Sequence, residues 1–186
     1  IYTLSLHDAL PIFDSSLISI DISNLKTGNG INLNYLFNGL PSLTFVNISN
    51  FNVENETYLS YMFYSCDTLN SVDFSNFKAE DNVYMDYMFY YCNSQVKLDM
   101  SNFRAHNNIH MYWMFSTSDI QHLNLSNFSV NCHIDMRYLA YSTSLMTPDL
   151  SNFHAENDTN MEYMFSYCNN LKYINISNFY SKNNTN

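Results

Sequence analysis

Glycine and proline are scarce in this chain, with three of each among 186 residues. Collagen-like and low-complexity linker sequences are rich in both, so those classes are excluded. Only 13% of the residues are charged, and 17 acids against 7 lysines and arginines give a net charge of −10. Such a charge repels phosphate, so we expect no nucleic acid partner. No apolar run approaches the about 18 residues of a membrane-spanning helix, so we expect no membrane span.

Apolar and aromatic side chains are abundant instead. The chain is 46% hydrophobic and contains 16 tyrosines, 14 phenylalanines and 10 methionines. Disordered acidic segments are poor in such residues, so this chain is expected to bury a substantial core.

The chain is built from a short repeat. The tripeptide Ser-Asn-Phe/Leu occurs seven times, at intervals of 26, 26, 26, 25, 25 and 26 residues. Its serines are Ser23, Ser49, Ser75, Ser101, Ser126, Ser151 and Ser177. We number positions within each repeat from this serine. Regular repeats of this length indicate stacked units that bury a common core.

Two hydrophobic periods coexist in each repeat. Before the serine, apolar residues alternate with Asp or Asn, as in Val72-Asp73-Phe74, which predicts a short strand. After it, positions 10, 13, 14 and 17 are apolar in most repeats, a spacing that predicts one face of a short helix. The predicted fold is therefore an α/β solenoid with one strand and one helix in each 25–26-residue repeat and one parallel sheet.

The repeat resembles a known family. The stretch MFYSCDTLNSVDFSNF (Met62–Phe77) returns as MFYYCNSQVKLDMSNF and MFSYCNNLKYINISNF, and it is similar to the leucine-rich repeat of BspA-like surface proteins. This resemblance implies a right-handed, leucine-rich-repeat-like stack on a cell surface or in a secreted protein. It also implies a role in adhesion, with a protein or carbohydrate ligand on a host or neighbouring cell.

Residues 13–186 are expected to form a single domain of about seven rungs that is truncated at both ends and therefore frays or associates. Residues 1–12 are set apart, because Tyr2–Ile12 (YTLSLHDALPI) resembles the translation of a sequencing adapter. We expect them to be an artefact or disordered; the alternative is a genuine N-terminal segment. One repeat departs from the pattern at Ala140, Thr143 and Pro148, and Pro148 removes a hydrogen-bond donor from a strand, so this rung is expected to be the weakest.

Catalytic and metal-binding patterns are not found. The sequence has no Ser/His/Asp arrangement, no glycine-rich phosphate loop and no CxxC pair, so we expect no enzyme activity, cofactor or metal. Cys66, Cys92 and Cys168 share position 17, which also accepts Ser118 and Thr143. They are expected to be buried free thiols; a disulfide between neighbouring rungs is the alternative.

Two columns of residues are candidate binding surfaces. The first lies two residues before each serine and is expected to point outward from the sheet; its acids are Asp21, Asp73, Asp99 and Asp149. It is either a ligand-facing surface, with or without a cation, or a polar strand face that keeps the sheet soluble. The asparagine after each serine is expected to point inward and to be structural.

The second column, at position 12, is aromatic in every unit and consists of Tyr35, Tyr61, Tyr87, Trp113, Tyr138 and Tyr163. It is expected on the outer side, where an exposed aromatic ribbon would bind protein or sugar. The alternative is a ladder of rings that stack on one another. The sequence thus favours a non-enzymatic binding or adhesion protein, with a structural spacer or antigenic coat element as the alternative.

Overall fold

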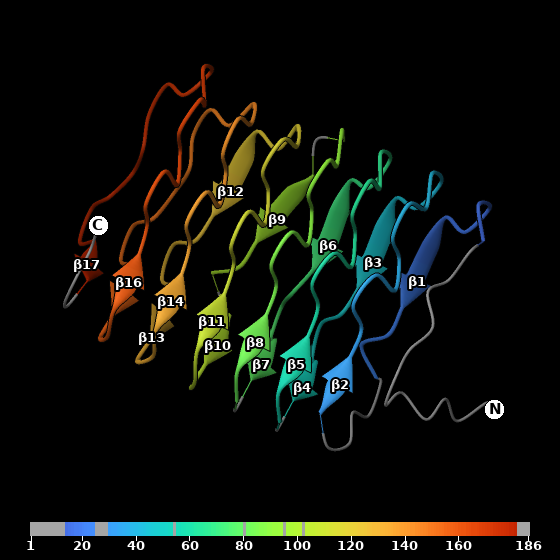
Figure 1. Cartoon of the computed structure of the whole chain (residues 1–186), viewed down its shortest axis with the longest axis horizontal. Coiled ribbons are helices and arrows are strands. Elements are labelled where there is room, and N and C mark those ends of the chain that lie inside the picture. The colour runs from blue at the N-terminus through green and yellow to red at the C-terminus, as the bar shows by residue number, and fades with distance from the viewer. Residues whose placement is uncertain are drawn as a thin grey trace.

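The computed structural model describes residues 14–24, 30–53, 55–79, 81–94, 96–101 and 103–181, and it shows a parallel β-solenoid (Figure 1). Each turn of the chain forms one rung, and short strands of successive rungs pair in register. All strand pairs of the described residues are parallel, as in Val46 beside Val72. The segment Tyr2–Ile12 lies outside the described residues.

Three sides of the solenoid carry sheets. Sheet A precedes the Ser-Asn turn and contains β1 (Ser19–Asp21), β3 (Phe45–Asn47), β6 (Ser71–Asp73), β9 (Lys97–Asp99) and β12 (His122–Asn124). Sheet B contains β2 (Ile31–Asn32), β5 (Thr57–Tyr58), β8 (Val83–Tyr84), β11 (Ile109–His110), β14 (Ile134–Asp135) and β16 (Thr159–Asn160). Sheet C, with β4 (Asn52–Val53), β7 (Lys78–Ala79) and β10 (Arg104–Ala105), and sheet D, with β13 (Ser129–Val130), β15 (His154–Ala155) and β17 (Tyr180–Ser181), follow the turn.

The predicted α/β solenoid with one helix in each repeat and a single parallel sheet is wrong. None of the described residues is helical, and the segment expected to be a helix is a series of turns. Its backbone N–H groups alternate between two partners: Tyr61 donates to the carbonyl of Asp86 in the next rung, and Met62 donates to the carbonyl of Leu59 in its own rung. A helix needs every interior N–H to bond four residues back, so inter-rung bonding excludes it.

The side chains predicted to be buried on the helix face are nevertheless buried. Met85, Met88, Phe89 and Cys92 are all inaccessible to solvent or nearly so. Inside the solenoid, phenylalanines of successive rungs stack in two columns with ring centroids 5.1–5.9 Å apart. The repeat pattern therefore identifies the core correctly although it misassigns the backbone.

The asparagine after the serine lies outside in every rung in which the structure describes it, and the prediction that it points inward is wrong. Asn50 and Asn76 are exposed and have φ angles of 60° and 59°. Asparagine tolerates this left-handed conformation better than most residues. The expected hydrogen bonds between rungs do form, since Asn76 Nδ2 donates to Asn50 Oδ1 over 3.2 Å.

Sheet A loses its regular strands at the rung that contains Pro148. Beyond β12, only single bridges connect Asn124, Asp149 and Asn175. The carbonyl of Pro148 still accepts the N–H of Asn175 over 3.1 Å, but proline has no N–H to donate. This rung is therefore irregular in sheet A, and its being the weakest rung stays a prediction. In the part of the chain that the structure describes, no helix is long and apolar enough to cross a membrane.

Candidate functional site

The aromatic column at position 12 lies at the corner of each rung, after sheet B. All six of its residues have positive φ, between 55° and 61°. Two backbone hydrogen bonds fix the corner, as at Tyr87. Its N–H donates to the carbonyl of Tyr112 in the next rung, and its carbonyl accepts the N–H of Tyr90. Bulky residues rarely adopt this conformation, so each rung carries local backbone strain here.

The rings of this column form one continuous stack. Tyr61 stacks on Tyr35 and on Tyr87, with centroids 4.8 Å apart in both cases. The stack continues at 6.3 Å from Tyr87 to Trp113, at 5.0 Å to Tyr138 and at 5.0 Å to Tyr163. We call these six residues the aromatic ladder. The structure thus shows the stacked arrangement that was the alternative to a freely exposed ribbon.

Only the edges of the inner ladder rings reach solvent. Tyr35 and Tyr163, at the two ends, are 43% and 52% exposed, whereas the four inner rings are partly buried. Burial, with smaller contributions from nearby phenols and from Asp86, raises the pKa of Tyr87 to about 12. The ladder therefore presents ring edges and neutral phenol groups, and the faces of its inner rings are covered.

Further rings surround the ladder. One row follows position 15 and includes Tyr64, Tyr90 and Tyr141; Tyr90 meets Tyr87 at 88° and 5.5 Å. A shorter stack of Tyr58, Tyr84 and His110 lies on sheet B, with centroids 4.8 and 4.7 Å apart. We define the aromatic face as the ladder, these two rows, and the tyrosines that contact them: Tyr91, Tyr112 and Tyr167.

Charged groups are embedded in this face. Asp86 Oδ1 accepts the backbone N–H of Tyr112 over 2.8 Å, and burial raises the pKa of the Asp86 carboxyl. The Asp135 carboxylate accepts hydrogen bonds from two side-chain nitrogens of Arg137, from Nε at 2.9 Å and from Nη2 at 2.6 Å. Burial opposes ionisation of Asp135, but the hydrogen bonds and charge of Arg137 outweigh it and lower its pKa. The Arg137 guanidinium also lies 5.2 Å from the ring centroid of Tyr112.

The Asp/Asn column of sheet A has a structural role in every rung. Each side-chain oxygen accepts the backbone N–H of the serine two residues later, at 2.8–3.2 Å, from Asp21 and Ser23 to Asn175 and Ser177. These bonds build the turn that ends the strand. Hydrogen bonds from the side chain of the serine, with a smaller contribution from its backbone N–H, lower the pKa of Asp21 beside Ser23 and of Asp149 beside Ser151. The side chain of Asp73 lies on the outer face of sheet A, so the predicted orientation of the column is correct. Ligand binding by this column stays a prediction.

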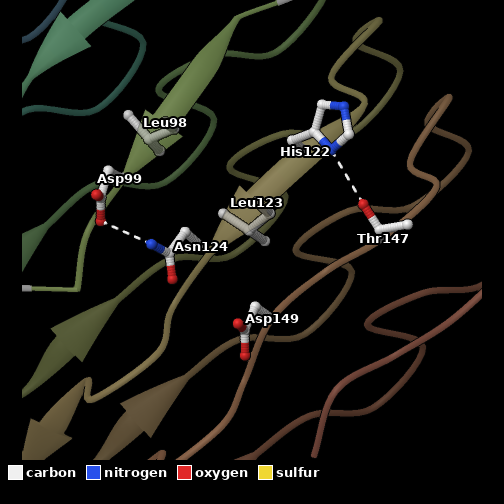
Figure 2. Close-up of a pocket in the computed structure, with 7 residues that line it drawn as sticks. All are labelled: Leu98, Asp99, His122, Leu123, Asn124, Thr147 and Asp149. Atoms are coloured by element: carbon white, nitrogen blue, oxygen red, sulfur yellow. Dashed lines mark hydrogen bonds between the residues drawn. The ribbon is translucent and has the colours of Figure 1, made fainter.

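A shallow depression of about 370 Å³ lies on this face at the end of β12 (Figure 2). Its polar side chains bond to one another: Asn124 Nδ2 donates to Asp99 Oδ1 over 3.1 Å, and His122 Nδ1 lies 3.0 Å from Thr147 Oγ1. Asp149 also lines the depression, next to Asn124 in the same column. Because these groups already have partners, the sheet A face is a weaker candidate for ligand binding than the aromatic face.

The cysteines line the core. The thiols of Cys66 and Cys92 donate to the carbonyls of Phe37 and Phe63, at 3.0 and 2.9 Å. Burial raises the pKa of Cys66 to about 11, which leaves little reactive thiolate at neutral pH. Among the residues described, no three His, Cys, Asp or Glu side chains are grouped so that they could hold a metal ion.

Comparison with known families matches two overlapping stretches, residues 11–128 and 85–179, to a family described as "Mycoplasma protein of unknown function, DUF285". The chain belongs to this family. No curated protein and no solved structure matches the chain. DUF285 membership supports the repeat architecture, and the family description assigns no activity.

Several residues of the aromatic face were not predicted from the sequence. Tyr91 and Tyr167 occupy position 16, where other rungs have Gly39, Ser65 or Ser142. That exchange of small residues for tyrosine is visible in the sequence and could have identified them. The Asp135–Arg137–Tyr112 cluster had no such signal: Arg137 and Tyr112 share position 11 in neighbouring rungs, but this position holds Asn34, Ser60, Asp86 and Glu162 elsewhere.

Proposed function

We propose that this chain is a non-enzymatic binding protein of a BspA-like type, located on a cell surface or secreted, and that its aromatic face contacts a protein partner. The observation that carries this proposal is the uninterrupted aromatic surface, which runs from Tyr35 to Tyr163. Tyrosine and tryptophan dominate the energetics of protein interfaces, because they offer a large apolar area and a polar group.

The geometry of the ladder favours a protein over a carbohydrate. Sugar rings pack on open aromatic faces, and the inner ladder rings have both faces covered by neighbours 4.8–6.3 Å away. Edges and hydroxyl groups remain available, and these suit hydrogen bonds and edge-on contacts with a protein surface.

The second candidate is a structural spacer or coat element without a specific ligand. The same stacking favours this candidate, because rings that pack on one another stabilise the solenoid without any binding partner. The two candidates differ in what happens when surface rings outside the ladder are removed.

The decisive experiment uses a triple variant of position 15: Tyr64→Asn, Tyr90→Ser and Tyr141→Ser. Asn38, Ser116 and Ser166 occupy this position in other rungs, so the replacements are compatible with the fold. Purified protein is tested against arrays of extracellular proteins and of glycans. We expect binding to a protein that the triple variant loses by about tenfold or more.

The control is Phe45→Ser on sheet A, where neighbouring rungs have Ser19 and Ser71. It removes an exposed aromatic ring from a different face and should leave binding unchanged. A chain that binds only glycans would contradict the protein proposal. Binding to nothing on either array would favour the spacer.

A further inference from the structure

Among the rings of the aromatic face outside the ladder, two tyrosines stand out by their exposure. Tyr91 and Tyr167 are 44% and 66% exposed, more than any inner ring of the ladder. Tyr91 meets Tyr64 at 86° and Tyr90 at 67°, and Tyr167 meets Tyr141 at 67°. Neither ring is stacked in parallel on another ring within the described residues, so both have surface to offer a ligand.

Their backbone conformation makes these tyrosines costly. Tyr91 and Tyr167 have φ angles of 59° and 60°. Position 16 has the same left-handed backbone at Gly39, Ser65, Thr117 and Ser142, where the side chain is small. A tyrosine here gains no place in the ladder to offset the strain. Strain that the fold does not need is a reason to look for a role in binding.

The charge of the aromatic face as a whole points to the chemistry of the partner. Asp86 and Glu162 flank the ladder, where their charges act on Tyr87 and Tyr138. The nearby cation, Arg137, is neutralised by its bidentate contact with Asp135. The aromatic face therefore carries a net negative charge, in line with the −10 of the whole chain.

The face already contains one example of the contact that such a surface favours. The guanidinium of Arg137 lies 5.2 Å from the ring centroid of Tyr112 while it remains paired with Asp135. Aromatic rings combined with carboxylates attract guanidinium groups in particular, because the planar cation stacks on a ring and donates to a carboxylate at once.

We propose that the aromatic face recognises a protein segment rich in arginine, with Tyr91 and Tyr167 as the rings on which its guanidinium groups stack. This inference rests on the proposed function and names the partner class for the same surface. An anionic polymer would be repelled by the carboxylates, and a neutral sugar carries no positive charge for them to attract.

The test uses three fluorescein-labelled nonapeptides in which serine alternates with arginine, lysine or glutamate. Their affinities are measured by anisotropy with the full chain at 50 and 150 mM salt. We expect the arginine peptide to bind several-fold more tightly than the lysine peptide, and the glutamate peptide not to bind. The variant Tyr91→Ser/Tyr167→Ser should weaken arginine-peptide binding about fivefold or more, as the loss of two cation–π contacts predicts.

A matched variant separates recognition from general charge attraction. Asp73→Asn/Asp99→Asn removes two carboxylates from sheet A, and Asn47 and Asn124 show that the turn accepts asparagine. It should change the affinity by less than twofold at 150 mM salt. Equal binding of the arginine and lysine peptides, or an equal loss in both double variants, would overturn the inference. So would the absence of arginine-peptide binding.

The outcome is separable from that of the proposed function. If the arrays reveal a neutral or acidic protein whose binding is lost in the position 15 variant, the proposed function stands and the arginine inference falls. If the arginine peptide binds through Tyr91 and Tyr167 while the arrays reveal no protein, the arginine inference stands and the proposed function falls.

Discussion

At the scale of single residues, the ladder tyrosines combine an unfavourable backbone with a favourable side-chain contact. Tyr87 has a φ of 57° and stacks between Tyr61 and Trp113. Left-handed backbone costs most residues about 1–2 kcal/mol, and an aromatic pair contributes about 0.5–1.5 kcal/mol beyond its buried area. Two stacked neighbours therefore suffice to offset the strain.

This balance predicts how Tyr87 responds to substitution. Tyr87→Ala should lower the free energy of unfolding more than Tyr87→Asn does, by about 1 kcal/mol, because asparagine tolerates the left-handed backbone. Urea unfolding of both variants measures the difference. Tyr84 is the control: it also stacks between two rings, at 4.8 and 4.7 Å, but lies in the extended β8. If alanine and asparagine differ equally at both sites, backbone strain is not the cause.

Asp86 is a second residue with a testable energetic role. Its carboxylate accepts the N–H of Tyr112, and Asn34 accepts the N–H of Ser60 in the same way two rungs earlier. Burial raises the pKa of Asp86 above the ordinary 3.8, so its charged form is the unfavourable one in the fold. Asp86→Asn keeps the acceptor and removes that charge.

We therefore expect Asp86→Asn to stabilise the protein at pH 7, by up to about 1 kcal/mol. In the wild type, the folded state binds the extra proton between pH 3.8 and the raised folded pKa, so its stability is lost as pH rises through that window. The advantage of the variant should shrink as the pH falls through it and disappear below pH 3.8. Urea unfolding from pH 3.5 to 7 measures this. A constant advantage at all pH values would contradict it.

At the scale of elements, one corner shows two changes that compensate for each other. Trp113 replaces the ladder tyrosine in the rung where Ser116 replaces the tyrosine of position 15. The indole contacts Tyr90 at 6.0 Å and Tyr141 at 5.3 Å, the two rings on either side of the missing one. The larger ring thus occupies the space that serine leaves.

A double-mutant cycle tests this pairing. Trp113→Tyr should create a space and Ser116→Tyr an overpacked corner, each costing about 1–3 kcal/mol. The double variant restores the arrangement of the neighbouring rungs and should recover at least about 1 kcal/mol of the summed loss. Urea unfolding of all four proteins gives the coupling free energy. Additive losses would show that the two positions do not compensate.

Pro148 defines the rung that interrupts sheet A. The same strand position contains Val72, Leu98 and Leu123 in regular rungs, so Pro148→Leu supplies an apolar side chain and a backbone donor. We expect a gain of about 1 kcal/mol in the free energy of unfolding. Hydrogen exchange should also show slower exchange for amides next to Asp149. Unchanged stability and exchange would mean that proline is not what limits this rung.

The sequence alone predicts the core but not the path of the backbone. The spacing of Met85, Met88, Phe89 and Cys92 is that of a helix face, and all four side chains are buried. A pair of consecutive corners presents the same residues inward, so hydrophobic spacing cannot distinguish the two. The distinction depends on where N–H groups bond, and Phe63 donates to Met88 of the next rung, a partner that no local pattern reveals.

The candidate site is likewise only partly predictable from the sequence. The outward column from Tyr35 to Tyr163 is identifiable because a repeat fixes which residues align. The covering of its ring faces depends on the rung spacing, which the sequence does not contain. Tyr91 and Tyr167 can be recognised as strained residues only once the structure shows that the backbone at position 16 is left-handed.

At the scale of the whole molecule, the backbone hydrogen bonds run along the solenoid from rung to rung. Tyr61 bonds to Asp86 and Phe89 to Met114, and β1 and β17 lie at opposite ends of the solenoid (Figure 1). A pulling force applied between those ends acts along these hydrogen bonds. The bonds between two rungs should therefore break together, and the rungs should separate one at a time. Each released rung of 25–26 residues yields roughly 85 Å of chain.

Single-molecule stretching should therefore give a series of small, evenly spaced extensions, and a single all-or-none rupture would contradict this. A protein held between two surfaces in this way would lengthen under load and dissipate mechanical work rung by rung, so that an attachment made through it yields gradually before it breaks.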